Sequence, residues 1–226
     1  MTEGRDVEAL DRLLGDRYSC RAYLPDPVPR ATIERIFELG RRSASWCNVQ
    51  PWQVRVLSGD ATDRFRAALL DWSDHAEVNH DIAHPERYEG VHRQRRRDSA
   101  FQLYSAVGVE WGNREQSAVQ ARENFRLFGA PHVAVLSIPK ILGPYAVLDT
   151  GVYLGTLMLA ARSLGVDTTP QAALSNYSEQ IRDHLSIPED ENVVAGLSFG
   201  YADDGHPANS YRTPRADLAE TVTWVD

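Results

Sequence analysis

Lysine is almost missing from this chain of 226 residues. Lys140 is the single lysine among 24 basic residues, so arginine carries nearly all of the positive charge. Arginine stays protonated in proteins and does not form Schiff bases. The composition therefore argues against covalent catalysis through a lysine, and it leaves arginine as the side chain that would bind an anion.

Cysteine is also scarce. The sequence has two cysteines, Cys20 and Cys47, and neither lies in a Cys-x-x-Cys pair. Their spacing excludes the dithiol redox motif and the cysteine-rich zinc sites. We expect both residues to be free thiols, because disulfides are characteristic of oxidising compartments.

Long hydrophobic runs are absent as well. Hydrophobic residues make up 42% of the chain and charged residues 25%, and no apolar run approaches the length of a membrane span. The amino terminus, Met-Thr-Glu-Gly-Arg-Asp, lacks the apolar core of a secretory signal. We expect a globular protein of the cytoplasm that does not enter a membrane.

The formal net charge of -8 excludes another class of partner. Nucleic-acid binding needs a basic surface that neutralises phosphates, so we expect no nucleic-acid partner. The length suits one domain, residues 1–226, with enough chain for a hydrophobic core and no visible repeat.

One polar loop stands out between a helical and a strand-like segment. It runs from Ser43 to Trp52 and follows an amphipathic pattern over Ala31–Arg42. The side-chain amides of Asn48 and Gln50 can read the edge of a planar heterocycle, and the proline after Gln50 favours an extended backbone there. A ligand-binding loop and a simple proline-stiffened connection explain this loop equally well.

A second segment indicates an anion site. Arg17, Ser19 and Arg21 alternate along the chain just after a short amphipathic helix over Val7–Leu14. Guanidinium groups bind phosphate through paired hydrogen bonds, and a serine hydroxyl between them adds a neutral donor. The segment predicts a phosphate-binding site.

These two segments occur in an order that resembles the nitroreductase family of FMN-dependent flavoproteins. The resemblance rests on the Arg17-x-Ser19-x-Arg21 run, the helix entry Pro27-Val28-Pro29, the loop from Ser45 to Trp52, and Arg215 near the carboxyl end. It covers both ends of the chain, and the middle resembles the family more loosely.

The resemblance implies a fold, an assembly and a cofactor. The expected fold is α+β, with a mixed, mainly antiparallel sheet covered by helices, in an intertwined homodimer with FMN at each interface. NAD(P)H would be the co-substrate. The family arrangement places the flavin ring between the Asn48 loop of one subunit and the Arg17 segment of the other.

The resemblance also implies roles for individual residues. Arg17, Ser19 and Arg215 would hold the phosphate, with Arg212 as a weaker candidate, and Arg21 would support the reduced flavin. Ser45, Asn48 and Gln50 would bind the ring edge or the ribityl chain. The backbone of Gln171, Ala172 and Ala173, after Pro170, would face flavin N5. Some family members carry an acidic residue where this chain has Ala172. No side chain is expected to act as a nucleophile.

The resemblance implies that the middle of the chain, residues 73–128, forms an excursion over the flavin. Ser73–Arg97 is polar, which indicates a hydrated mobile segment. Its pair His80 and His84 lacks a third ligand at motif spacing, so we expect no metal site. A lid that binds an anionic substrate through Tyr88, Arg96 and Arg97 is one interpretation of the arginine-rich part, and a solvated helix face is the other.

Hydrophobic periodicity predicts the remaining elements. The expected helices are Thr62–Trp72, Arg114–Phe128, Tyr145–Leu164 as a buried central helix, and Asn176–Leu185; the expected strands follow Trp52 from Val54 and cover His132–Ile138, Val193–Phe199 and Thr221–Val225. The glycines do not have the spacing of a Rossmann or Walker motif.

The sequence therefore predicts an FMN-dependent NAD(P)H oxidoreductase that reduces a small aromatic acceptor, a nitroaromatic or a quinone, by a ping-pong mechanism. Two alternatives remain open. One is a flavin-dependent dehydrogenase, oxidase or reductive dehalogenase of the same fold. The other is a non-catalytic protein that binds flavin or another small molecule.

Overall fold

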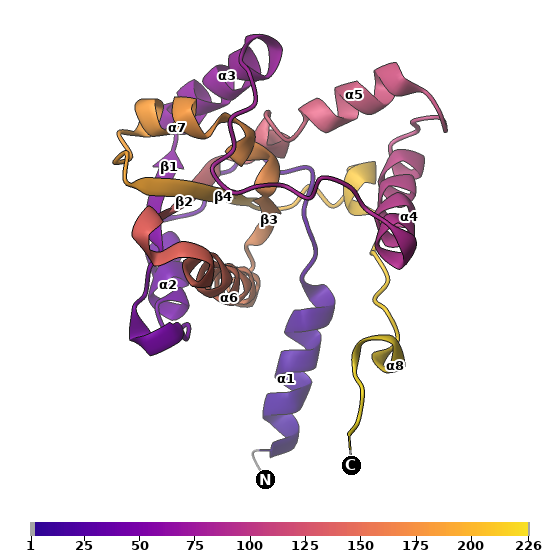
Figure 1. The fold of residues 1–226 in the computed structure, drawn as a ribbon. Coiled ribbons are helices and arrows are strands. Elements are labelled where there is room, and N and C mark those ends of the chain that lie inside the picture. The colour runs from indigo at the N-terminus through magenta and orange to yellow at the C-terminus, as the bar shows by residue number, and fades with distance from the viewer. Residues whose placement is uncertain (1–2, 226) are drawn as a thin grey trace.

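The computed structural model describes residues 3–225, and its centre is one four-stranded sheet (Figure 1). The strands lie in the order β1 (Gln53–Ser58), β2 (His132–Pro139), β4 (Glu191–Gly200) and β3 (Asp167–Gln171). All three pairings are antiparallel, and Val133 of β2 lies opposite Leu57 of β1 and Ser198 of β4. The prediction of a mainly antiparallel sheet in an α+β fold is confirmed.

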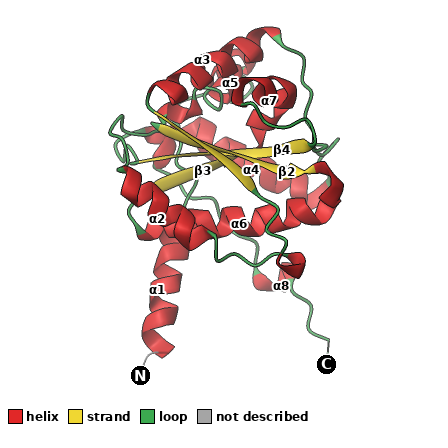
Figure 2. Ribbon diagram, turned by 90° about the vertical axis from the view of Figure 1, so that its left-hand side faces the viewer, coloured by secondary structure: helices red, strands yellow, loops and turns green. Residues whose placement is uncertain are grey.

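Helices cover both faces of the sheet (Figure 2): α2 (Arg30–Gly40) and α6 (Gly143–Ser163) on one face, α3 (Asp60–His75) and α7 (Ser178–Leu185) on the other. Alternate residues of a strand point to opposite faces. Val133 and Val135 of β2 therefore pack in the cluster that contains side chains of α3 and α7. Ala134 and Leu136 pack in the cluster of α2 and α6. This explains why the sequence of β2 is apolar throughout.

Helix α6 lies close to α2 but is only partly covered. Gly40, at the end of α2, permits the close approach, because a Cβ atom there would lie 2.4 Å from Cδ2 of Leu157. On another part of α6, Tyr145, Leu148 and Val152 are exposed. The helix predicted to be buried and central is thus only partly buried in the single chain.

Residues between α3 and β2 leave the sheet and form two outlying helices, α4 (Gly90–Ala106) and α5 (Arg114–Arg122) (Figure 1). Neither helix contains a fully buried residue. The predicted helix over Arg114–Phe128 ends at Arg122. It cannot reach Phe128, because Leu127 and Phe128 take positive φ angles of 56° and 52° in a 3₁₀ turn, Leu127–Gly129.

The start of this excursion is bonded to α7. Asn79 accepts a hydrogen bond from the backbone of Glu179 at 3.1 Å and donates to Gln180 at 2.8 Å. Asp81 pairs with Arg182 and accepts from the backbone of Val193 at 2.8 Å. In this part of the segment predicted to be hydrated and mobile, the polar residues thus serve as hydrogen-bond partners of α7 and β4.

His80 and His84 of this segment stack in parallel. Their ring centres are 4.5 Å apart, and the backbone from His80 to His84 is not helical. Within residues 3–225, no group of three or more metal-ligating side chains comes together.

Both ends of the chain extend away from the sheet (Figures 1 and 2). Helix α1 (Glu3–Asp16) is exposed along most of its length, and the tail carries one short helix, α8 (Leu218–Thr221). The predicted strand Thr221–Val225 does not form in the described chain. A strand requires a partner for its backbone N–H and C=O groups, and none lies beside the tail in residues 3–225.

The other short elements are 3₁₀ turns at Trp46–Asn48, Lys140–Leu142, Ala172–Tyr177 and Pro207–Asn209. The predicted helix Asn176–Leu185 begins as one of these turns and becomes α-helical at Ser178. Among the helices of residues 3–225, none combines the length and the apolar character that crossing a bilayer requires.

Candidate functional site

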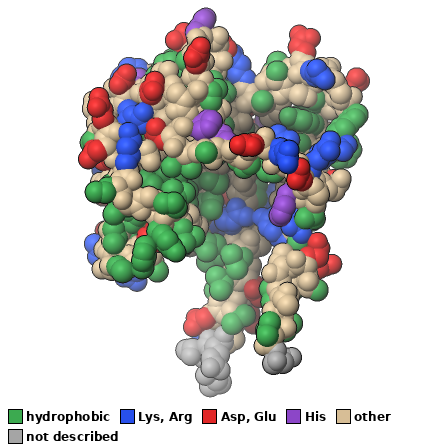
Figure 3. Space-filling model, viewed as in Figure 1, with side chains coloured by type: hydrophobic (Ala, Val, Ile, Leu, Met, Phe, Trp, Pro, Cys, Tyr) green, Lys and Arg blue, Asp and Glu red, His purple; other side chains and the backbone are tan. Residues whose placement is uncertain are grey.

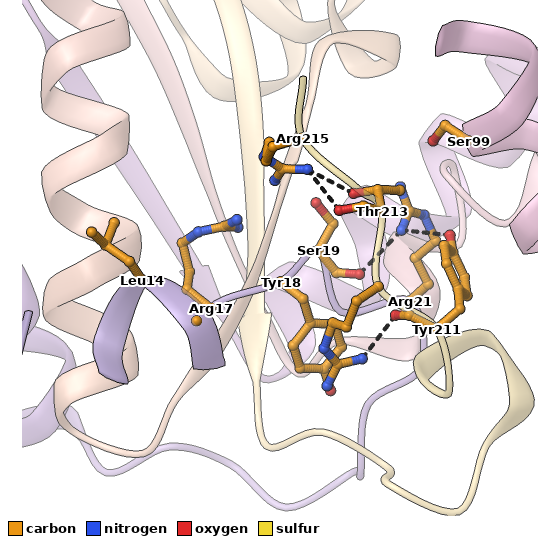
Figure 4. A pocket seen from close by; sticks show the side chains of 11 residues that line it. Leu14, Arg17, Tyr18, Ser19, Arg21, Ser99, Tyr211, Thr213 and Arg215 are labelled. Carbon is orange, nitrogen blue, oxygen red and sulfur yellow. Dashed lines mark hydrogen bonds between the residues drawn. The ribbon is translucent and has the colours of Figure 1, made fainter. Parts of the chain in front are cut away.

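Five of the predicted cofactor-binding residues line one pocket of about 340 Å³ beside the base of α1. In Figure 4, the side chains of Arg17 and Arg215 extend toward the same space, next to Ser19. This arginine pocket is lined by Leu14, Gly15, Arg17, Tyr18, Ser19, Arg21, Ser99, Tyr211, Arg212, Thr213 and Arg215. Segments almost 200 residues apart in the sequence thus form one cationic wall.

Edge strand β3 holds the first segment in place. Ser19 forms an isolated parallel bridge with Thr168, and the backbone N–H of Cys20 donates to the carbonyl of Thr168 at 3.1 Å. Cys20 is fully buried as a free thiol, and burial raises its pKa to about 11. Because side chains alternate along an extended backbone, burying Cys20 leaves Ser19 and Arg21 directed to the pocket.

Asn209 links the carboxyl-terminal tail to the segment around Arg21 through hydrogen bonds. Its Oδ1 accepts from the backbone N–H of Arg21 at 2.8 Å, and its Nδ2 donates to the carbonyls of Ala22 and Asp203 at 2.8 and 2.9 Å. The hydroxyl of Tyr211 accepts from the guanidinium of Arg21 at 3.0 Å. The sequence did not reveal either residue, and no local pattern marks an asparagine whose partner is 188 positions away.

The arginines of this pocket have no acidic partner at ion-pair distance in the part of the chain that the structure describes. None of the ion pairs in residues 3–225 involves Arg17, Arg21, Arg212 or Arg215. Burial, together with the nearby charge of Arg215, lowers the pKa of Arg17. Four guanidiniums without a carboxylate, in a chain of net charge -8, favour a bound anion with several oxygen acceptors.

The two tail arginines are placed differently. The guanidinium of Arg215 donates to the carbonyl and the hydroxyl of Thr213, both at 3.0 Å. The guanidinium of Arg212 lies over the ring of Tyr18 at 3.7 Å and donates to the carbonyl of Asn209 at 2.8 Å. Arg212 therefore attaches the tail to the first segment, while Arg215 is directed into the pocket beside Arg17.

The loop that carries Asn48 and Gln50 has a strained backbone. Cys47, Asn48 and Gln50 have φ angles of 50°, 56° and 49°, in the left-handed region that side chains other than glycine rarely adopt. Each such residue costs on the order of 1–3 kcal/mol unless its surroundings enforce the conformation. The predicted extended backbone at Gln50 is therefore wrong.

Contacts from Ser45 and α6 enforce this conformation. Ser45 Oγ accepts from the backbone N–H of Gln50 at 2.9 Å, and both carboxylate oxygens of Asp149 accept from the backbone N–H of Trp46 at 3.1 Å. The side chains of Asn48 and Gln50 are exposed. The loop thus presents two amides outward, as a ligand-reading loop would, yet no residue of it lines the arginine pocket.

The segment Pro170–Ala173 ends edge strand β3 and continues into the next 3₁₀ turn. The side chain of Gln171 is buried: its Oε1 accepts from Ser198 at 2.5 Å and its Nε2 donates to the carbonyl of Asn124 at 2.7 Å. Only backbone groups of Gln171 are left for a ligand. Gln171, the last residue of β3, lies three residues beyond Thr168, about 10 Å along the same sheet edge.

The predicted substrate residues lie on the outlying segment. The guanidinium of Arg96 is 5.2 Å from the ring centre of Tyr88, and that of Arg97 is 5.5 Å from that of Trp111. Arg95 pairs with Glu220 of the tail at 3.0 Å. Tyr88, Arg96 and Arg97 do not line the arginine pocket, although Ser99 on the same helix does.

The chain therefore separates its predicted site residues into distinct places. The arginine pocket and Pro170–Ala173 share the β3 edge, whereas the loop from Ser45 to Gln50 lies against α6, and Tyr88 and Arg96 lie on the excursion. Figure 3 shows basic side chains in the hollow above α1 and a separate hydrophobic area near α2 and α6.

Comparison with known proteins gives consistent matches over nearly the whole chain. The model of the nitroreductase family matches residues 14–201. Nitroreductase NfnB of Mycolicibacterium smegmatis is 40% identical over 96% of this chain and 93% of its own length. A 4-nitrobenzoate reductase of Pseudomonas putida is 33% identical over 96% of this chain and 95% of its own length.

A solved structure agrees with these matches. The FMN-dependent nitroreductase NfnB from Mycobacterium smegmatis, in complex with NADPH, superimposes with a TM-score of 0.93 at 38% identity. The alignment covers 97% of this chain and 99% of that structure. The resemblance inferred from the arginine run, the amide loop and Arg215 is confirmed, and this chain belongs to the nitroreductase family.

Proposed function

We propose that this protein is an FMN-dependent oxidoreductase that takes a hydride from NAD(P)H and reduces small nitroaromatic compounds. The observation that carries the proposal is the arginine pocket beside β3, whose arginines have no acidic partner at ion-pair distance in residues 3–225. The relatives named as nitroreductase and 4-nitrobenzoate reductase, and the FMN-dependent structure in complex with NADPH, support the same cofactors and the same class of acceptor.

The residues of the pocket suit a phosphate monoester. Arg17 and Arg215 supply two charged donors, and the hydroxyl of Ser19 between them supplies a neutral donor. Burial, and to a lesser extent the charge of Arg215, lowers the pKa of Arg17, and a dianionic phosphate would offset both effects. The phosphate of FMN is therefore assigned to this end of the β3 edge.

FMN supplies a ring that accepts a hydride and passes electrons on. Arg21 is the cation placed to stabilise the negative charge that the reduced ring gains. Its guanidinium is already fixed by bonds to the Ser19 carbonyl at 3.2 Å and the Tyr211 hydroxyl at 3.0 Å, so little reorganisation is needed. Ala172 offers no carboxylate, so at this position only backbone groups would be available to the ring.

A second copy of the chain is assigned to complete each site. Exposed apolar side chains on α1 (Val7, Leu10, Leu14), on α6 (Tyr145, Leu148, Val152) and in the tail (Trp224, Val225) form surfaces that a monomer would leave in water. The strand-like tail Thr221–Val225 has no partner in residues 3–225, and β1 pairs on one side only. An intertwined homodimer accounts for all of these features, with the Asn48 loop of one subunit meeting the arginine pocket of the other.

The acceptor is assigned to the side of the flavin that the excursion covers. Arg96 and Arg97, with Tyr88, would attract an anionic aromatic compound such as a nitrobenzoate. Because NAD(P)H and the acceptor would use one face of the ring in turn, the kinetics are ping-pong. The cytoplasm, where reduced nicotinamides are available, is the proposed location.

The visible spectrum of the purified protein tests the proposal. The protein should carry the oxidised flavin spectrum, NADPH or NADH should bleach it without oxygen, and 4-nitrobenzoate should restore it. A colourless protein that takes up no FMN would refute the function. Bleaching without reoxidation by any nitroaromatic or quinone would instead favour a dehydrogenase or dehalogenase of the same fold.

A further inference from the structure

Helix α6 contacts the loop from Ser43 to Trp52, the amide loop that carries Asn48 and Gln50, through three side chains spaced one turn apart. Tyr145 lies against the ring of Trp46 with centres 4.3 Å apart, Asp149 accepts from the Trp46 backbone, and Tyr153 stacks on Trp52 with centres 4.4 Å apart. Residues at i and i+4 share one face of a helix. This face therefore holds the loop near both of its ends.

Asp149 is the unusual member of this set. The residue is 7% exposed, and its carboxylate has no basic partner within ion-pair distance among residues 3–225. Both of its oxygens instead accept from one backbone N–H, that of Trp46. A buried carboxylate without a cation is costly, so its retention here needs a reason beyond packing.

The strained backbone of the loop supplies that reason. Three of the next four residues after Trp46 have positive φ, and none of them is glycine. Fixing the Trp46 N–H fixes the peptide plane from which the left-handed turn starts. Without this anchor the loop would relax toward ordinary φ values, and the amides of Asn48 and Gln50 would change direction.

We propose that Asp149 is a positioning residue for the flavin: through the Trp46 N–H it holds the amides of Asn48 and Gln50 in the orientation that binds the ring in the site of a second subunit. This inference rests on the proposed FMN function. Asp149 would thus affect cofactor binding from its buried place on α6, without touching the cofactor itself.

Two variants separate positioning from stability. Asp149→Ala removes the anchor, and Asp149→Asn keeps one acceptor oxygen. Thr150→Val is the matched control, because Thr150 is also buried on the same helix and its hydroxyl bonds only to the Ala146 carbonyl within the helix at 2.7 Å.

The first measurement is hydrogen exchange of the FMN-free protein. Asp149→Ala should speed exchange of the amides from Trp46 to Gln50, whereas Thr150→Val should leave them unchanged. The second is fluorescence titration with FMN, in which Asp149→Ala should raise the dissociation constant about tenfold, as expected for loss of a charge-assisted anchor. Asp149→Asn should lie between Asp149→Ala and the parent, and the bound flavin spectrum should shift in Asp149→Ala.

Faster exchange with an unchanged FMN dissociation constant and spectrum would overturn the inference, because Asp149 would then only stabilise the loop. Equal weakening by Thr150→Val would overturn it too, by showing a general effect of α6. A parent protein that binds FMN but reduces no nitroaromatic would refute the proposed function while the titration still decides the role of Asp149. A parent that takes up no FMN would refute both.

Discussion

The arginine pocket and the amide loop are built by opposite physical means. The pocket gathers four like charges on backbone that hydrogen-bonds to edge strand β3 and to Asn209. The loop from Ser45 to Gln50 carries no charge of its own. Its shape comes from left-handed residues, and Asp149 of α6 holds it through a hydrogen bond to its backbone. In the proposed FMN site, the first region would therefore bind through electrostatics, whereas the second would bind through preorganisation.

Removing charge from the pocket should have the largest effect. Arg17→Ala combined with Arg215→Ala should abolish FMN retention on a desalting column, since each charge-assisted bond to phosphate contributes roughly 1.5–3 kcal/mol, with exposed Arg215 at the lower end. Arg35→Ala is a matched control, because Arg35 is a surface arginine paired with Glu38 at 3.0 Å. If the double variant keeps its flavin, the phosphate assignment is wrong.

Changing the amides should have a smaller effect that does not depend on salt. Asn48→Ala and Gln50→Ala should each weaken FMN binding by about 0.5–1.5 kcal/mol, the net contribution of a neutral hydrogen bond. Titrations at low and high ionic strength distinguish the two regions, because salt should weaken binding through the arginine pocket and leave the ratio between parent and amide variants constant. A ratio that changes with salt would mean that the loop acts through charge after all.

Removing charge from the excursion, residues 73–128, should have the smallest effect, and only on the reduction of anionic acceptors. Arg96→Gln with Arg97→Gln should raise the Michaelis constant for 4-nitrobenzoate severalfold and leave that for a neutral quinone nearly unchanged, since only the anion is attracted by the two charges. Steady-state kinetics with NADPH check this, and high salt should erase the difference. An equal change for both acceptors would show that these arginines support the excursion's structure through Tyr88 and Trp111 instead.

The two regions also differ in how much of them the sequence predicts. Arg17, Ser19 and Arg21 are local in the chain, so their spacing alone indicates the anion site. Asn209 and Asp149 escape prediction because their partners lie 188 and 103 positions away, and a single asparagine or aspartate carries no pattern. Strand β2 is predicted almost to the residue, since burial on both faces makes a continuous apolar run.

Two predicted secondary-structure elements differ from the structure for physical reasons that the hydrophobic pattern of the sequence does not contain. The helix predicted to Phe128 ends at Arg122, and it cannot extend to Phe128 because Leu127 and Phe128 have left-handed backbone. The strand predicted over Thr221–Val225 does not form because strand pairing needs a neighbour, and residues 3–225 offer none. In the proposed homodimer, a second copy would provide that neighbour.

In the proposed homodimer, one chain supplies the arginine pocket and the other supplies the amide loop of each FMN site. Subunit exchange between two impaired proteins tests this. One protein carries Arg17→Ala with Arg215→Ala, the other carries Asn48→Ala with Gln50→Ala, and they are mixed at an FMN concentration at which each alone binds little flavin. A shared site predicts that each mixed dimer has one intact site, so FMN binding and nitrobenzoate reduction return on mixing. If each site lies within a single chain, every site in the mixture is damaged, and the absence of any recovery would contradict the shared site.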